Sequence, residues 1–177
     1  MSLTSSDVSE IKIFDDFLDK SELEKVLKRL DSPAIWEVQC SAKEEDKLFA
    51  GYFSKSQEFL YLDVTKEKYF NSYLFDKIKE KLDQKCELER IYFNGQWPGR
   101  DGGLHDDRCK YSALVYVGPY EADWGGFTQF VISHTKQYII PPIQNRLAIF
   151  PSHIPHKAYS FSNQNCPMRI SLVFKLY

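Results

Sequence analysis

The chain has 177 residues, a length that fits one domain with a sizeable hydrophobic core. Hydrophobic residues make up 43% of it and aromatic residues 15%, which excludes a disordered protein. Its 23 basic and 25 acidic residues leave a formal charge of −2, so nothing in the charge predicts binding to nucleic acid or to a membrane surface.

The sequence predicts one cytoplasmic domain over residues 1–177. No apolar run is long enough to span a bilayer, and the polar, acidic start at residues 1–10 is unlike a secretory signal. The cysteines lack CxxC spacing, so we expect reduced thiols and neither a zinc site nor disulfides. These cysteines are Cys40, Cys86, Cys109 and Cys166.

Helical patterns occupy the first half of the chain, about residues 1–86. Ser21 and Glu24 have the spacing of a capping box, in which each side chain satisfies a free amide at a helix start. Apolar residues follow at the spacing of one helical face, namely Leu23, Val26, Leu27 and Leu30. A second helix is predicted over Lys66–Lys85, and we expect both helices to be scaffold. The aromatic-rich segment Ala34–Leu62 between them could line a substrate entrance, although core packing is the favoured interpretation.

From Glu87 onward, short β-prone segments alternate with glycine and proline turns. The predicted strands are Leu88–Asn94, Tyr111–Val117, Phe127–Ile132, Gln137–Ile140, Arg146–Phe150, Lys157–Phe161 and Met168–Phe174. Strands of this length without intervening helices favour a β-sandwich or barrel over about residues 87–177.

One HxD motif stands out among the polar residues. If the segment is extended, His105 and Asp107 project to the same face and can converge on one metal ion, whereas Asp106 points away. His156 follows a buried-looking strand and can supply a third ligand. Two imidazoles and one carboxylate form the facial triad typical of non-haem Fe(II) oxygenases, which leaves coordination positions open. An HxD pair by itself is also common in solvated loops, and His153 is a rival for the third ligand position.

Arg169 opens the last predicted strand, and Ser171 follows on the same face. A planar guanidinium is suited to capturing a carboxylate through two hydrogen bonds. The neighbouring residues are apolar, so the strand looks buried on both faces, and a buried arginine requires an anionic partner. The alternative interpretation of Arg169 is a surface charge.

The ordered set of motifs resembles the Fe(II)- and 2-oxoglutarate-dependent dioxygenases. In particular it resembles the prolyl 4-hydroxylase-like branch, which includes small stand-alone members in microbes and viruses. The matching segments are residues 91–95, 103–107, 124–130, 145–151, 154–156 and 169–172. They cover about half of the chain, from Leu88 to its end.

The resemblance implies a mainly β fold, the double-stranded β-helix (a cupin-like jelly roll), with the N-terminal helices packed outside one sheet. It implies that His105, Asp107 and His156 ligate iron, since a Pro-His pair after a Phe-Pro-Ser turn matches the family better than His153 does. We expect His134 to be solvated.

The resemblance also implies the co-substrate site. Arg169, supported by Ser171, would bind the distal carboxylate of 2-oxoglutarate. Tyr116 would reach the same carboxylate, and Tyr92 would contact the co-substrate or the substrate. Each tyrosine could equally be a core aromatic. The Trp-Gly-Gly sequence at residues 124–126 is expected to form a tight turn without a catalytic role.

The activity implied is oxidative decarboxylation of 2-oxoglutarate by dioxygen, coupled to hydroxylation of a substrate, with ascorbate as a candidate reductant. A peptidyl proline is the favoured substrate, and a small molecule is the alternative. Nucleic-acid demethylases end in an Arg-x5-Arg pattern, whereas the second position here is Lys175. The rival from another class is a non-catalytic, cupin-like metal- or ligand-binding module. The sequence makes no prediction of oligomeric state.

Overall fold

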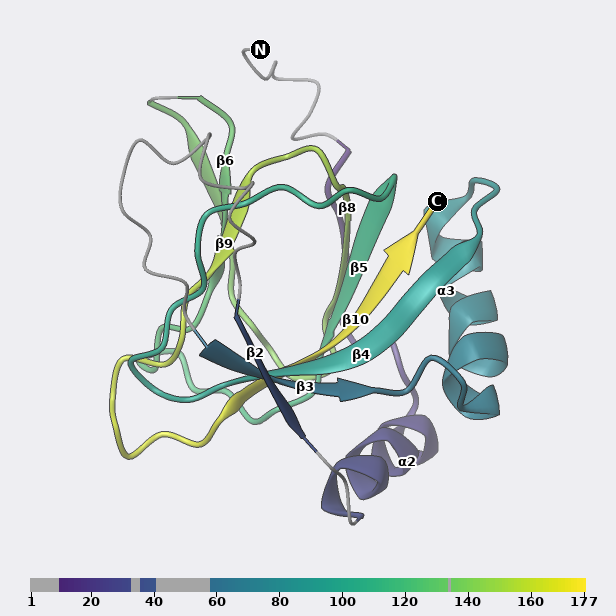
Figure 1. The fold of residues 1–177 in the computed structure, drawn as a ribbon, viewed down its shortest axis with the longest axis horizontal. Coiled ribbons are helices and arrows are strands. Elements are labelled where there is room, and N and C mark those ends of the chain that lie inside the picture. Colours follow the sequence, from purple (N-terminus) through teal and green to yellow (C-terminus); the bar gives the residue numbers. More distant parts are fainter. Residues whose placement is uncertain (1–9, 33–35, 41–57, 134) are drawn as a thin grey trace.

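The structure is a computed structural model that describes residues 10–32, 36–40, 58–133 and 135–177 (Figure 1). The elements in chain order are β1 (Lys12–Phe14), α2 (Lys20–Asp31), β2 (Glu37–Cys40), β3 (Glu58–Asp63), η2 (Tyr69–Leu74), α3 (Phe75–Leu82), β4 (Leu88–Gln96), β5 (Tyr111–Tyr116), β6 (Thr128–Val131), β7 (Gln137–Ile140), β8 (Leu147–Pro151), β9 (His156–Ala158) and β10 (Arg169–Leu176). Across these segments, no helix has the length and apolar character needed to cross a membrane.

The strands form two antiparallel sheets. The large sheet has the order β1-β8-β5-β10-β4-β3-β2, and the small sheet has the order β7-β6-β9. An isolated bridge between His105 and His156 attaches the segment before β5 to β9, at the edge of the small sheet. Figure 1 shows the small sheet facing one side of the large sheet, with α2 and α3 on its other side. The described chain is therefore mostly β, with helices on one outer face.

The alternation of residues along β10 separates two cores. Leu172, Phe174 and Leu176 belong to the cluster between the large sheet and the helices, which includes Val26 and Ile78. The residues between them in the sequence face the small sheet, because successive side chains of a strand point to opposite faces. The cluster between the two sheets is Tyr116, Phe130, Ile132, Ile140, Ala148, Phe150 and Ile154.

The start of α2 differs from the prediction. Asp19, and not Ser21, is the N-cap, and its carboxylate accepts from the Glu22 backbone N–H at 2.9 Å. Glu22 completes the capping box by accepting from the Asp19 N–H at 2.7 Å. Asp and Ser cap helices about equally well, and Glu22 is held in place by an ion pair with Lys77 at 2.5 Å. The predicted pairing of Ser21 with Glu24 is therefore wrong.

The first half of the chain is less helical than predicted. The helix expected over Lys66–Lys85 is shorter, with a π-helical turn in η2 before α3, and it ends at Asp83 in the left-handed region (φ 58°). Three short strands, β1, β2 and β3, also lie in this half and extend the large sheet. Short strands of this kind are fixed by pairing with partners distant in the sequence, which periodicity does not report.

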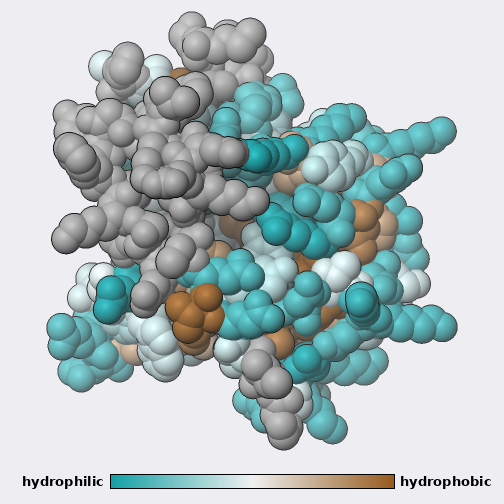
Figure 2. All heavy atoms as spheres, in the orientation of Figure 1, coloured by the Kyte–Doolittle hydropathy of each residue, from teal (hydrophilic) through white to brown (hydrophobic). Residues whose placement is uncertain are grey.

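The second half contains each of the predicted strands, with shifted ends. The clearest shift is in β9, which covers His156–Ala158 where Lys157–Phe161 was expected. Aromatic residues of the Ala34–Leu62 segment pack in cores, namely Trp36, Phe59 and Tyr61; Phe49, Tyr52 and Phe53 lie outside the described residues. Free thiols are found at Cys86, Cys109 and Cys166. The described surface in Figure 2 is mainly hydrophilic, with small scattered apolar patches.

Candidate metal centre and anion site

Three side chains converge at one end of the space between the sheets. The ligand atoms of His105, Asp107 and His156 all lie within 4.8 Å of one another. The backbone of the HxD segment is bonded to β9, since His105 N–H donates to His156 O at 3.0 Å and His156 N–H donates to His105 O at 2.8 Å. A further bond from Asp107 N–H to Ser152 O, at 2.9 Å, holds the carboxylate end of the segment. The three side chains are thus set by backbone pairing.

Hydrogen bonds select the tautomer of both histidines. Nδ1 of His105 lies 2.9 Å from Gly103 O, and Nδ1 of His156 lies 2.9 Å from Ile154 O. A carbonyl oxygen can only accept, so both Nδ1 atoms carry the proton and both Nε2 atoms keep a lone pair. His105 Nε2 is 3.7 Å from Asp107 Oδ1, and His156 Nε2 is 3.5 Å from Asp107 Oδ2. This donor set is the one a divalent metal ion requires.

His156 lies in an apolar pocket. Its ring centroid is 4.8 Å from that of Phe150 and 5.9 Å from that of Phe130. Burial, reinforced by the neighbouring His105, lowers the pKa of His156 to about 3. The imidazole is therefore neutral at ordinary pH, as a metal ligand must be.

Asp107 is surrounded by donors. Ser112 Oγ donates to its Oδ2 at 2.6 Å, and the ammonium of Lys175 donates to the same oxygen. Ser152 Oγ lies 3.0 Å from Ser112 Oγ and 3.0 Å from the thiol of Cys109. Burial alone would raise the pKa of Asp107, but His156, Lys175 and His105 together hold it well below the usual range. The carboxylate is thus ionised and ready to bind a cation.

A second polar cluster lies around Arg169, at the start of β10. Its side chain is almost fully buried, at 2% exposed. Nε donates to Gly126 O at 2.7 Å, one terminal nitrogen donates to Gln96 Oε1 at 2.9 Å, and the other donates to Thr128 Oγ1 at 2.9 Å. All three acceptors are neutral, and no carboxylate pairs with Arg169 among the residues described. Burial lowers the pKa of Arg169. Because its described partners are all neutral, none of them compensates the positive charge.

Gly126 cannot be replaced without disturbing this cluster. Its φ of 73° is in the left-handed region, and a Cβ would lie 2.4 Å from the ring of Phe161. The backbone can therefore approach closely and present its carbonyl to Arg169. The turn at residues 124–126 was expected to have no catalytic role, and its contact with Arg169 was not predicted.

The other predicted co-substrate residues lie between the two clusters. Ser171 of β10 is paired in register with Asn94 of β4 on one side and with Tyr116 of β5 on the other. The hydroxyl of Tyr116 lies 2.8 Å from Thr128 Oγ1, and the ring of Tyr116 is 5.3 Å from the guanidinium carbon of Arg169. Asn94 Oδ1 is buried and has no hydrogen-bond partner among the described residues.

Tyr92 lies two residues before Asn94 on β4, on the side of the triad, and is paired in register with Val173 of β10. Its ring stacks on that of Tyr61, with a centroid distance of 4.7 Å. Burial is the main cause that raises the pKa of Tyr92. Tyr92 therefore combines core packing with a position beside the metal centre.

The rival residues are arranged differently. His153 and Asp106 are exposed, and neither belongs to the cluster of ligand atoms. His134 lies outside the described residues.

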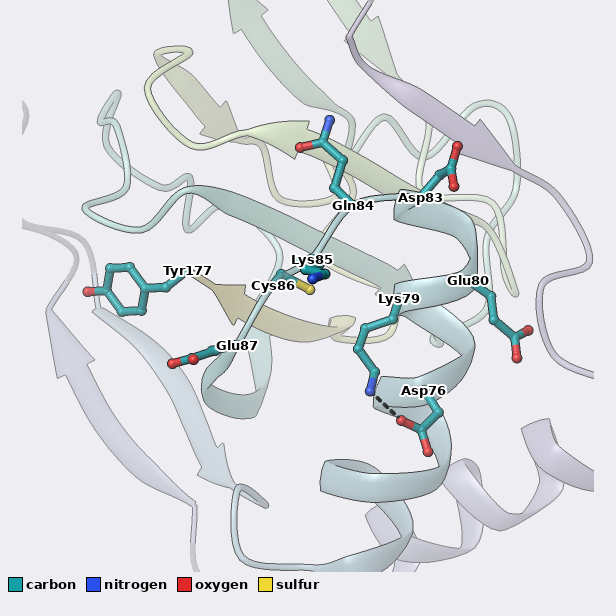
Figure 3. A pocket seen from close by; sticks show the side chains of 9 residues that line it. All are labelled: Asp76, Lys79, Glu80, Asp83, Gln84, Lys85, Cys86, Glu87 and Tyr177. Atoms are coloured by element: carbon teal, nitrogen blue, oxygen red, sulfur yellow. Dashed lines mark ion pairs between the residues drawn. The ribbon is translucent and has the colours of Figure 1, made fainter.

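A surface hollow lies away from both clusters, beside α3 and the ends of β4 and β10 (Figure 3). Its lining includes an ion pair of 2.6 Å between Lys79 and Asp76. Charges of both signs line it, namely Asp76, Glu80, Asp83 and Glu87 with Lys79 and Lys85. It contains no histidine, and most of its lining residues are charged, so it lacks the features of a catalytic pocket.

Sequence reasoning missed four residues of the two clusters, which are Gln96, Ser112, Thr128 and Lys175. Three of them could have been found from alternation. Gln96 is in phase with Tyr92 on β4, Ser112 is in phase with Tyr116 on β5, and Lys175 is in phase with Arg169 on β10.

Several solved structures with the same fold are 2OG-Fe(II) oxygenases or prolyl hydroxylases. A 2OG-Fe(II) oxygenase family oxidoreductase from Burkholderia pseudomallei has a TM-score of 0.73 and 11% identity, over 95% of this chain and 85% of that one. A prolyl hydroxylase from Trichoplax adhaerens, in complex with a hypoxia inducible factor peptide fragment, has a TM-score of 0.70 and 17% identity, over 95% and 83%. The viral collagen prolyl hydroxylase of Paramecium Bursaria Chlorella virus-1, in a 2OG complex, has a TM-score of 0.65 and 16% identity, over 98% of both chains.

No protein-family model matches the sequence, and no curated protein matches it significantly. The likeness is therefore one of fold: two facing antiparallel sheets arranged as in 2OG-Fe(II) oxygenases, prolyl hydroxylases among them. The His-Asp-His cluster lies within this fold.

Proposed function

We propose that the chain is an Fe(II)- and 2-oxoglutarate-dependent oxygenase that hydroxylates its substrate. One observation carries the proposal: the fold holds a His-Asp-His cluster whose two Nε2 atoms face the carboxylate and, along the same space between the sheets, a buried arginine that pairs with no acid among the described residues. The first feature suits a divalent metal ion, and the second suits a carboxylate.

The triad residues fit Fe(II). His105 and His156 each bond a backbone carbonyl through Nδ1 and turn Nε2 toward Asp107, which presents an ionised carboxylate. Three protein ligands on one side of the ion leave the remaining positions for a chelating acid and for dioxygen. When bound, iron would allow dioxygen to oxidise 2-oxoglutarate to succinate and carbon dioxide, with one oxygen atom entering succinate and the other entering the substrate as a hydroxyl group.

The residues around Arg169 fit the distal carboxylate of 2-oxoglutarate. Gly126 O, Gln96 and Thr128 hold the guanidinium in a fixed orientation. In our proposal Ser171 and Tyr116, which are paired in register on β10 and β5, complete the anion site.

The protein's contribution is orientation and exclusion of water. Backbone bonds from residues 105–107 to β9 and to Ser152, in the turn between β8 and β9, fix the ligands. The rings of Phe130 and Phe150 exclude water from the His156 side of the centre. Tyr92 is placed to contact the co-substrate or the substrate beside the triad. The free thiols of Cys86, Cys109 and Cys166 suit a reducing cytoplasm.

For the substrate we propose a peptidyl proline. The support is the fold likeness to a prolyl hydroxylase bound to a peptide fragment and to a viral collagen prolyl hydroxylase. Proline-containing peptides should gain one oxygen atom in mass when incubated with the iron-loaded protein, 2-oxoglutarate and dioxygen. Oxidation of a free small molecule, with every proline peptide unchanged, would contradict the substrate but not the reaction.

The decisive test is anaerobic titration with Fe(II) and 2-oxoglutarate. We expect a weak visible absorption band from the chelate in the wild type, and its loss in His156→Ala and in Arg169→Ala. His153→Ala is the matched control, because that exposed histidine lies outside the triad, and it should keep the band. A folded, iron-loaded wild type without the band would refute the oxygenase and favour a non-catalytic, cupin-like binding module.

A further inference from the structure

Lys175 is a buried cation in direct contact with the proposed metal centre. Only 4% of the residue is exposed, and its side chain lies on the inner face of β10. The ammonium donates to Asp107 Oδ2 and, at 3.1 Å, to Ser112 Oγ. A lysine is buried to this degree only when it has a partner, and here the partner is a proposed metal ligand.

The hydrogen bonds distinguish the two oxygens of Asp107. Oδ2 accepts from both Ser112 and Lys175. Oδ1 faces His105 Nε2 at 3.7 Å, and Oδ2 faces His156 Nε2 at 3.5 Å. Because two hydrogen bonds already occupy Oδ2, whereas Oδ1 accepts none from the described side chains, the contacts favour Oδ1 as the ligating oxygen. A carboxylate confined to one ligating oxygen keeps one more coordination position open.

The charges around Asp107 also affect how strongly a metal ion and an anion can bind there. The ammonium of Lys175 forms an ion pair with the Asp107 carboxylate, and the lysine is almost fully buried. A divalent ion that binds Asp107 must therefore do so beside a resident positive charge, in a place shielded from water. That repulsion weakens the hold on the metal ion, while the same charge attracts any anion that joins the metal.

We propose that Lys175 is a positioning residue that stays on Asp107 Oδ2 when the metal ion is bound, weakening metal affinity and strengthening the binding of the dianionic co-substrate. This inference rests on the proposed function, because it assumes that the triad binds a divalent ion and that 2-oxoglutarate joins it. It assigns to this lysine a role that neither the triad nor Arg169 can supply. Removing the lysine should therefore raise the metal affinity and lower the co-substrate affinity.

The test uses the Lys175→Met variant, with Lys175→Arg as the charge-conserving control. Mn(II) affinity is measured by titration calorimetry without co-substrate, and 2-oxoglutarate affinity is then measured on the Mn(II)-loaded protein. We expect Lys175→Met to bind Mn(II) about tenfold more tightly and 2-oxoglutarate about tenfold more weakly, each equivalent to about 1.4 kcal/mol. Lys175→Arg should return both affinities to within about threefold of the wild type.

Other results would overturn the inference. A merely structural lysine would weaken both affinities on removal, and an uninvolved lysine would change neither. Circular dichroism checks that the variant folds; if Lys175→Met does not fold, Lys175→Gln is measured in the same way and must show the same opposite signs. A wild type that binds neither Mn(II) nor 2-oxoglutarate would refute the proposed function together with the inference. If the wild type binds both Mn(II) and 2-oxoglutarate but Lys175→Met does not change the two affinities in opposite directions, only the inference is refuted.

Discussion

The inner face of β10 carries two buried cations with opposite surroundings. Arg169, at the start of the strand, is held by neutral oxygens and pairs with no carboxylate among the described residues. Lys175, six positions later, is bonded to Asp107 and Ser112. A buried charge without compensation costs stability, and proteins keep such groups where a ligand completes them. The comparison teaches that the charge of Arg169 is available to an anionic ligand, whereas the charge of Lys175 is already paired with Asp107.

The largest expected effect comes from removing the acid at the Lys175 end. Asp107→Leu should lower the free energy of unfolding by about 3–5 kcal/mol, because Lys175 is left buried and unpaired. Urea denaturation in the presence of a chelator measures this. The double variant Asp107→Leu with Lys175→Met should recover much of the loss; equal stability of single and double variants would contradict the pairing.

Removing the cation at the other end should affect ligand binding more than folding. We expect Arg169→Met to weaken binding of 2-oxoglutarate to the Mn(II)-loaded protein by about 100-fold, or about 2.7 kcal/mol, since charged hydrogen bonds are lost. Its cost in the free energy of unfolding should be smaller than that of Asp107→Leu. A larger cost in stability with unchanged co-substrate affinity would mean that Arg169 is structural.

A smaller effect is expected from Thr128, whose hydroxyl contacts both Arg169 and Tyr116. The nearly isosteric Thr128→Val change should lower the free energy of unfolding by about 1–2 kcal/mol, because a buried guanidinium loses one acceptor. Chemical denaturation tests this, with Tyr116→Phe as the matched control that removes only the other hydroxyl. Identical losses in the two variants would assign the effect to the hydroxyl pair and not to Arg169.

The smallest effect is a pH dependence at the Lys175 end. His156 has a pKa of about 3 in the folded protein, below the ordinary value of 6.5. The unfolded chain thus takes up a proton below pH 6.5 that the folded chain refuses. Stability of the metal-free protein should fall by about 1 kcal/mol between pH 6 and pH 5 on this account. His156→Asn should lack this contribution in urea denaturation at the two pH values, and parallel slopes would show that His156 does not titrate as described.

Alternation along strands was the most informative sequence signal, and it was used incompletely. It placed His105 with Asp107 and Arg169 with Ser171, and the structure brings the first pair together with His156. The same rule applied to Lys175 would have placed it on the inner face. The lysine was instead considered only as a departure from an Arg-x5-Arg ending.

Other features could not be read from the sequence. The partners of Arg169 come from β4, β6 and the turn before β6, so they depend on how the sheets pack. The helix start was misplaced because Asp19 and Ser21 can each act as a cap. Strand β1 has three residues and exists through its pairing with β8.

The bridge between His105 and His156 has a mechanical consequence. His156 belongs to the small sheet, whereas Lys175 and Ser112, which hold Asp107, belong to the large one. A metal ion bound to the triad would therefore crosslink the two sheets at one end of the space between them. The supply of iron would then govern how firmly the two halves of the fold stay closed, as well as whether the site can react.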